Sequence, residues 1–172
     1  MRKCLISTVL LLSMVFSLVG QNKTYFNSVP VVNGKVVFEQ FIVTEQGNNT
    51  KTNYAKLQIW ARNKFARSPL LSGMRFDEKT NSITVSSGEK LSEPQDMVMS
   101  YRLDLSATDA GYLLIVRDIS YQVKNKDSVF PKTTPAEMMI TDEAVNSGGE
   151  KQMKMDAKKS TLDFVNGLFN SL

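Results

Sequence analysis

The chain has 172 residues, a formal charge of +4, a single cysteine and no histidine. Without histidine it cannot form a Ser-His-Asp triad or a Cys-His pair, and one cysteine cannot supply a zinc site or an internal disulfide. Its length suits one domain together with a targeting segment.

Residues 1–20 have the pattern of a secretory signal peptide. Arg2 and Lys3 stand before an apolar run that extends to about Val19, and the small residue Gly20 precedes polar sequence. The run is short for a membrane span, which favours cleavage over a retained anchor helix. We therefore expect export.

Cleavage is expected after Gly20 or after Ser17. It would remove the single cysteine, Cys4, so that the mature chain would carry neither cysteine nor histidine. The formal charge would fall by two basic residues, from +4 to about +2, which is too little to indicate a polyanion partner by bulk charge. We expect the mature protein to lie in the periplasm or at the outer membrane, without a transmembrane span.

The next segments predict a leader, a strand and a helix. Residues 21–34 form a polar leader, and Lys35–Thr44 is rich in β-branched and aromatic residues, as is typical of a strand. Asn49 or the residue after it is expected to cap a helix over residues 50–67. Pro69 ends this helix, because a residue before proline is moved out of the helical region.

Four more strands are predicted after this helix. Leu70–Phe76 and Ser82–Ser87 form a hairpin signal around a polar loop. Met97–Ser106 alternates strictly between apolar and polar residues, which predicts a sheet with one buried face. Tyr112–Val123 is a further strand, and its apolar row breaks at Arg117-Asp118, where we expect a bulge.

The C-terminal part has a different character. Residues 124–149 are a charged connector in which a short helix can follow Pro135, and residues 150–172 predict an amphipathic helix. The order β-α-β-β-β-β-α predicts an α+β fold, with about five antiparallel strands and the helices on one face of the sheet. The domain itself would span residues 35–123. The apolar residues of the C-terminal helix recur at helical spacing: Leu162, Val165, Leu168, Phe169 and Leu172.

Two segments carry a resemblance to a known family: the strand FEQFIV and the helix TKTNYAKLQIWARNKF, with Tyr54, Trp60 and Phe65 at characteristic spacing. The sequence resembles exported proteins of Bacteroidetes-type bacteria that carry a domain of unknown function with a TATA-binding-protein-like fold. The likeness covers residues 35–123 and implies that fold and an envelope location. That family has no established activity, so no functional residue is transferred. The name of the fold does not imply DNA binding, because fold does not determine function, and we expect no nucleic-acid partner.

The helix over residues 50–67 combines a core stripe with basic residues. On a helical wheel Trp60 lies on the flank of the stripe, where an indole can be half covered with its N–H in solvent, and Ile59 points away from it. Ile59, Trp60 and Arg62 are therefore the candidate partner contacts. The stripe consists of Tyr54, Leu57, Ala61 and Phe65. The basic residues are spread around the wheel and not gathered on one face: Lys51, Lys56, Arg62, Lys64 and Arg67.

Carboxylates are the remaining groups for catalysis, and the sequence shows no pair at a set separation. Ser87 and Lys90 match the S-x-x-K spacing, but the partner motifs of the penicillin-recognising enzymes are missing. We predict that the protein is not an enzyme and has no catalytic, cofactor-binding or metal site. The carboxylates considered are Asp77, Glu78, Asp104 and Asp118.

Three hypotheses for function follow from these observations. The first is a non-enzymatic envelope module that binds a protein, peptide or glycan partner through an open sheet face or the tail. The alternatives are a carboxylate-dependent hydrolase, and a weak binder of polyanions or membrane surfaces through the helix over residues 50–67. Asp127-Ser128-Val129 is similar to the O-glycosylation sequence of Bacteroidetes envelope proteins, so Ser128 is a candidate modification site.

Overall fold

The structure is a computed structural model, which describes residues 25–123 and 132–172. The predicted signal peptide and Ser128 lie outside the described residues, and what was inferred about them stays a prediction. Within the described ranges, no helix combines the length and the apolar character that a membrane span needs.

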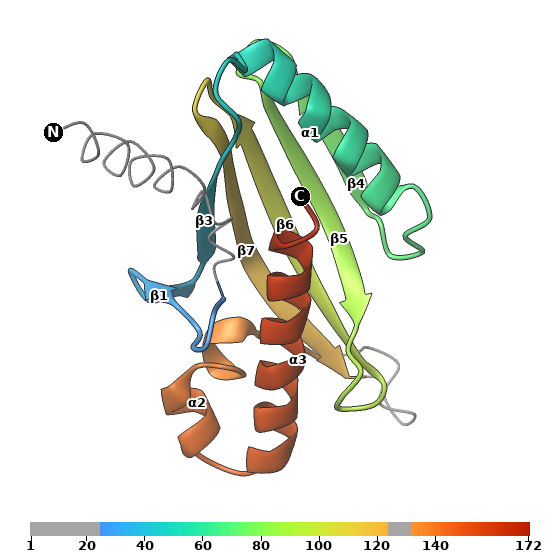
Figure 1. The fold of residues 1–172 in the computed structure, drawn as a ribbon. Helices are drawn as coiled ribbons and strands as arrows, with labels where there is room; N and C mark the ends of the chain where they lie inside the picture. The colour runs from blue at the N-terminus through green and yellow to red at the C-terminus, as the bar shows by residue number, and fades with distance from the viewer. Residues whose placement is uncertain (1–24, 124–131) are drawn as a thin grey trace, which may run out of the picture.

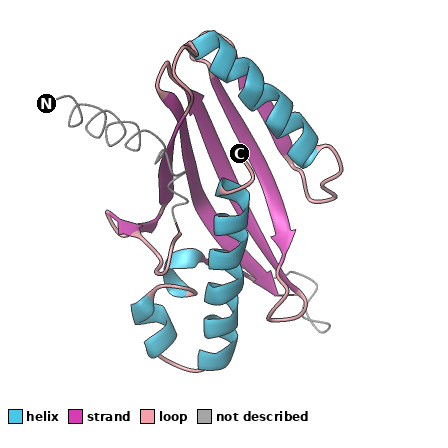
Figure 2. Ribbon diagram, in the orientation of Figure 1, coloured by secondary structure: helices cyan, strands magenta, loops and turns pink. Residues whose placement is uncertain are grey.

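The described residues form one antiparallel sheet with helices on one side, as predicted (Figures 1 and 2). The strand order in the sheet is β3-β7-β6-β5-β4, and the short β8 pairs with β7. The strands are β3 (Phe38–Val43), β4 (Gly73–Asp77), β5 (Ser82–Lys90), β6 (Met97–Ala107), β7 (Gly111–Val123) and β8 (Thr133–Pro135), with β1 (Val31–Val32) and β2 (Lys35–Val36) as a separate hairpin. The helices are α1 (Thr50–Phe65), the 3-10 helix η1 (Ala136–Met138), α2 (Asp142–Asn146) and α3 (Lys151–Phe169).

Several strand limits differ from the prediction, and one strand was missed. The strand β4 begins at Gly73 and not at Leu70, and β5 extends to Lys90 and not only to Ser87. The segment Lys35–Thr44 is divided, because its first residues pair with β1 in the hairpin and the N–H of Val37 donates to the carbonyl oxygen of Pro30 at 3.2 Å. The chain joins the sheet only at Phe38. The strand β8, which follows the connector, was not predicted: with three residues it has no alternation long enough to detect.

The buried face of the sheet carries the hydrophobic core. Buried and half-buried residues alternate along all of β6, as the sequence predicts. The helix α1 begins after Asn49, whose side chain accepts a hydrogen bond from the N–H of Thr52 at 2.9 Å. The predicted core stripe of α1 is buried: Tyr54, Leu57, Ala61 and Phe65. The inward residues of β6 are Met97, Met99, Tyr101, Leu103, Leu105 and Ala107.

The bulge predicted at Arg117-Asp118 is present. The pairing of β6 with β7 shifts between Ser100 and Arg102, and Asp118 has a φ of +54°. The extra residue lets β7 keep its apolar side on the core before and after the bulge. As a result, both Val116 and Ile119 are buried although they are three positions apart.

The helix α3 packs on the same core and holds the end of the leader. The side chain of Asn166 accepts from the N–H of Phe26 at 2.8 Å and donates to its carbonyl oxygen at 3.1 Å. The ring of Phe26 then lies 5.2 Å from that of Phe38 and 5.7 Å from that of Phe169. The leader is therefore fixed to β3 and α3 at this point, through a buried polar side chain that the apolar pattern of α3 did not reveal.

Candidate functional site

The candidate site is the face of the sheet that points away from the helices, which we call the open face. All described helices lie on the other side of the sheet (Figure 1). Alternate residues of β3 to β7 point to the open face, since side chains alternate along a strand. On β6 these are half-buried residues such as Arg102 and Asp104.

A polar network lies at the middle of the open face, with Asp104 at its centre. The Nε atoms of Arg117 and Arg102 donate to its carboxylate at 2.7 and 3.0 Å, and the hydroxyl of Thr84 donates at 3.0 Å. The strand register brings these side chains together, because Thr84 is directly opposite Asp104 and Arg102 is opposite Arg117. Arg117 also pairs with Asp118 at 3.0 Å.

The surroundings of Asp104 keep it ionised. Burial raises the pKa of its carboxyl group, but hydrogen bonds from Arg117, Arg102 and Thr84 outweigh this effect and lower the pKa below the ordinary value of 3.8. A carboxylate held in this state near neutral pH is a fixed anion paired with two guanidinium groups. It is not suited to act as a general acid.

Replacing Asp104 by asparagine is expected to lower the free energy of unfolding at pH 7 by about 1 kcal/mol, a small value because Arg102 and Arg117 are partly exposed and solvent screens the pairs. A lowered folded pKa stabilises the fold above the unfolded value, and the stabilisation is lost as the pH falls through the folded value. The difference between the two proteins should therefore shrink as the pH falls from 7 to below the ordinary carboxyl pKa of 3.8. Urea titrations at both pH values measure it, with Asp163→Asn, an exposed replacement on α3 outside the network, as the control. A difference that does not depend on pH would contradict the assignment.

An apolar patch borders this network on the open face. This surface, which is called the apolar patch from here on, consists of Phe41 and Val43 on β3 and Leu113 and Ile115 on β7. Phe41 is opposite Leu113, and Ile115 is opposite Asp104 in the neighbouring strand pair, so the patch is continuous with the network. Phe41 is 45% exposed and Val43 76% exposed, although both lie in a strand.

The predicted partner contacts lie on α1, on the other side of the sheet. Trp60 donates its Nε1–H to the carbonyl oxygen of Ser171 at 3.0 Å, so the expectation of a solvent-bound N–H was wrong. The guanidinium carbon of Arg62 lies 4.3 Å from the centre of the Phe76 ring. Both side chains thus have intramolecular contacts, whereas Ile59 is 62% exposed. Their role in partner binding stays a prediction.

The four carboxylates considered for catalysis do not form one cluster, although Asp104 and Asp118 both pair with Arg117. Asp77 accepts hydrogen bonds from the N–H groups of Thr80 and Lys79 at 3.2 and 2.9 Å, which lower its pKa and form the turn between β4 and β5. Asp104 is held by arginines in the middle of the open face. This placement gives no support to the hydrolase alternative.

The Ser87–Lys90 pair also lacks the arrangement of a dyad. Ser87 and Lys90 are three positions apart in β5, so their side chains point to opposite faces of the sheet. Ser87 is 4% exposed and its hydroxyl lies 3.3 Å from that of Ser68, whereas Lys90 is exposed. The lysine therefore cannot activate this serine.

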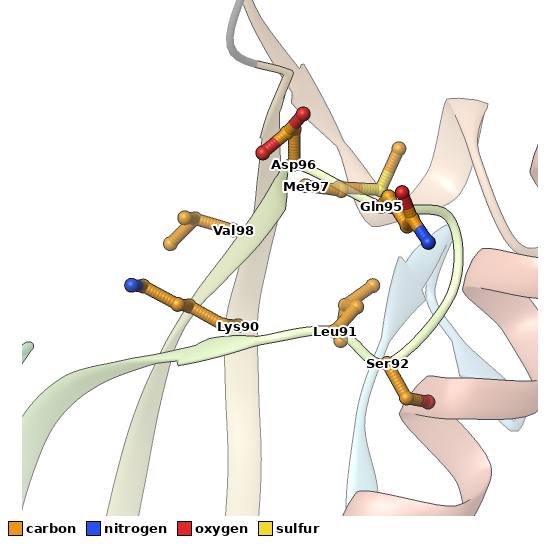
Figure 3. A pocket seen from close by; sticks show the side chains of 7 residues that line it. All are labelled: Lys90, Leu91, Ser92, Gln95, Asp96, Met97 and Val98. Carbon is orange, nitrogen blue, oxygen red and sulfur yellow. The ribbon is translucent and has the colours of Figure 1, made fainter.

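Two pockets lie away from the apolar patch and the Asp104 network. One of about 270 Å³ is formed where β5 and β6 join, and Figure 3 shows the side chains around it. It is smaller than the typical ligand cavity of roughly 300–1,000 Å³. The other, of about 560 Å³, lies between residues 25–27, α2 and α3. The described residues contain no group of three or more Cys, Asp or Glu side chains that could hold a metal ion. The smaller pocket is lined by Lys90, Leu91, Ser92, Gln95, Asp96, Met97 and Val98.

Two solved structures have the same architecture. A TBP-like protein from Parabacteroides distasonis ATCC 8503 superposes with a TM-score of 0.71 at 22% identity, over 83% of this chain and 92% of that one. The chain has the TBP-like fold. A DUF4468 family protein from Bacteroides ovatus ATCC 8483 superposes with a TM-score of 0.68 at 18% identity, over 86% of this chain and 89% of that one.

These neighbours confirm the resemblance to Bacteroidetes proteins that carry a domain of unknown function with the TBP-like fold. At such identities the likeness concerns the fold alone, so it assigns no activity, ligand or partner. No protein-family description matches the sequence, and no curated protein matches it.

Proposed function

We propose that this TBP-like protein is an exported, non-enzymatic envelope module that binds a protein partner through the open face. The observation that carries the proposal is the apolar patch next to the Asp104 network. Partly exposed aliphatic and aromatic side chains beside fixed charges are the composition of a protein interface, with an apolar centre and a polar rim. Export is supported by the signal-peptide pattern of residues 1–20.

A protein partner fits this surface better than a glycan does. Three of the four residues of the apolar patch are aliphatic, and Asp104 already has three hydrogen-bond donors from this chain. The side chains of the apolar patch offer no polar atom to sugar hydroxyls, while apolar side chains of a protein would bury the patch. The charged network would then select partners by electrostatic complementarity more than by affinity.

Site-specific photo-crosslinking tests the proposal. A photoreactive amino acid is placed at Ser106, on the open face, and in a matched control at Lys56, which is exposed on α1. In envelope extract we expect a protease-sensitive adduct from position 106 and none from position 56. The adduct should be lost when Ile115 is also replaced by arginine in a variant with an unchanged circular dichroism spectrum. No adduct from position 106, or equal adducts from both positions, would contradict the proposal.

A further inference from the structure

The strand β3 lies at an edge of the sheet, and its outer side is unpaired within the described part of the chain. It pairs with β7 alone, in continuous register from Phe38 to Val43. Exposed edge strands are usually protected by lysine, proline, a bulge or a covering segment. The sequence FEQFIV contains no lysine or proline, its register has no bulge, and its one charged residue is Glu39.

The free backbone groups of this edge belong to Glu39, Phe41 and Val43. The N–H of Thr44 donates to the carbonyl oxygen of Ala110 at 3.1 Å, which continues the ladder to β7. Backbone groups of successive residues in a strand point to opposite sides, so the even-numbered residues of β3 face β7 and the odd-numbered ones face outward. Val37 follows the same alternation, because its N–H points away from β7 and donates to the carbonyl oxygen of Pro30.

Exposed apolar side chains are concentrated at the same edge. Phe41 and Val43 are 45% and 76% exposed, and the β1–β2 hairpin adds Val31 and Val32 at 51% and 54%. Figure 1 shows this hairpin next to the start of β3, projecting from the sheet. The opposite edge differs, because β4 has an exposed arginine, Arg75, at its middle position.

We propose that β3 pairs with β3 of a second copy of this chain, antiparallel and around a two-fold axis at Phe41. Phe41 then lies opposite Phe41 of the second copy, and Glu39 lies opposite Val43. Each of the three outward residues donates one N–H and accepts at one carbonyl, so the pair holds about six hydrogen bonds. The inference shares Phe41 and Val43 with the apolar patch, but it rests on their outward backbone groups, and its test measures self-association and not the binding of another protein.

The self-complementarity of this register favours a second copy over another chain. An axis at Glu39 would place two carboxylates opposite each other, which is destabilising. An axis at Gln40 would bring Val43 opposite Val37, whose N–H is already bonded to Pro30. Only the axis at Phe41 uses all three outward residues without opposing like charges. It also places the two open faces on the same side, so that the two apolar patches meet across the axis.

Cysteine crosslinking tests the register on the mature chain, residues 21–172, which has no cysteine of its own. Residues opposite each other in a hydrogen-bonded antiparallel pair have Cα atoms about 5.5 Å apart, within the range of a disulfide. Phe41→Cys should therefore form disulfide dimers at least about tenfold faster than Ile59→Cys, the exposed control on α1. Glu39→Cys should not react with itself, but it should react with Val43→Cys when the two proteins are mixed.

The oligomeric state gives the second readout. Sedimentation equilibrium of the unmodified mature protein should show a concentration-dependent dimer. The double replacement Phe41→Lys and Val43→Glu should weaken it at least about 100-fold without a change in the circular dichroism spectrum, because two lysines would then meet at the axis and a second carboxylate would lie opposite Glu39. Ile59→Lys should leave the dimer intact. A monomer at all concentrations, or self-crosslinking of Glu39→Cys as fast as that of Phe41→Cys, would overturn the proposal.

Discussion

Replacing Gly111 by alanine is expected to lower the free energy of unfolding by about 3 kcal/mol and the melting temperature by roughly 6–12 °C. Gly111 begins β7 with a φ of +155°, and a Cβ atom there would lie 2.0 Å from the carbonyl oxygen of Ile42 on the adjacent β3. The atom in the way belongs to the backbone of a paired strand, which cannot move without breaking the ladder. Thermal unfolding followed by circular dichroism measures the effect.

The matched control is the same replacement at Gly167. This residue is exposed in α3, and nothing lies within 4 Å of an added Cβ atom. Alanine is a better helix former than glycine, so this variant should gain about 0.5–1 kcal/mol. Equal effects of the two alanines would show that β3 and β7 do not approach each other at Gly111 as closely as the structure has them.

Replacing Phe38 by alanine is expected to lower the free energy of unfolding by about 4 kcal/mol. Phe38 is 0% exposed, and its ring packs edge-to-face against Phe26, which in turn packs against Phe169. Its removal would leave a cavity where the leader, β3 and α3 meet. A total stability of only about 5–15 kcal/mol makes this a large loss, which urea unfolding measures.

Phe41→Ala provides the control on the same strand. Phe41 points to the open face and is 45% exposed, so its loss should reduce the free energy of unfolding by less than about 1 kcal/mol. Comparing the two variants thus distinguishes the buried face of β3, which stabilises the fold, from its open face, which is proposed to bind a partner. If Phe41→Ala destabilised the fold as much as Phe38→Ala, the assignment of the two faces of β3 would be wrong.

The sequence predicted the elements with regular patterns well. Along β6 the alternation of apolar and polar residues gave the buried face correctly, since side chains of a strand alternate whatever its neighbours are. The stripe of α1 was also correct, and the break at Arg117-Asp118 marked the bulge. Each of these signals depends only on residues within a single helix or strand.

The sequence did not predict contacts that depend on pairing between distant elements. It left open which carboxylates meet, and the network around Asp104 forms because the registers of β5, β6 and β7 align Thr84, Arg102 and Arg117 with it. The bond from Trp60 to the carbonyl of Ser171 joins residues 111 positions apart. No periodicity within α1 contains that information.

By itself, the sequence determined the α+β class, the order of the main elements and the absence of histidine and of a cysteine pair, because these depend on composition and short-range spacing. Only the tertiary structure decided that β3 is an edge strand, that the apolar patch adjoins the Asp104 network and that Asn166 holds the leader. The physical reason is that strand order and register arise from the packing of the whole core. A strand such as FEQFIV has the same local pattern at the edge of a sheet as in its centre.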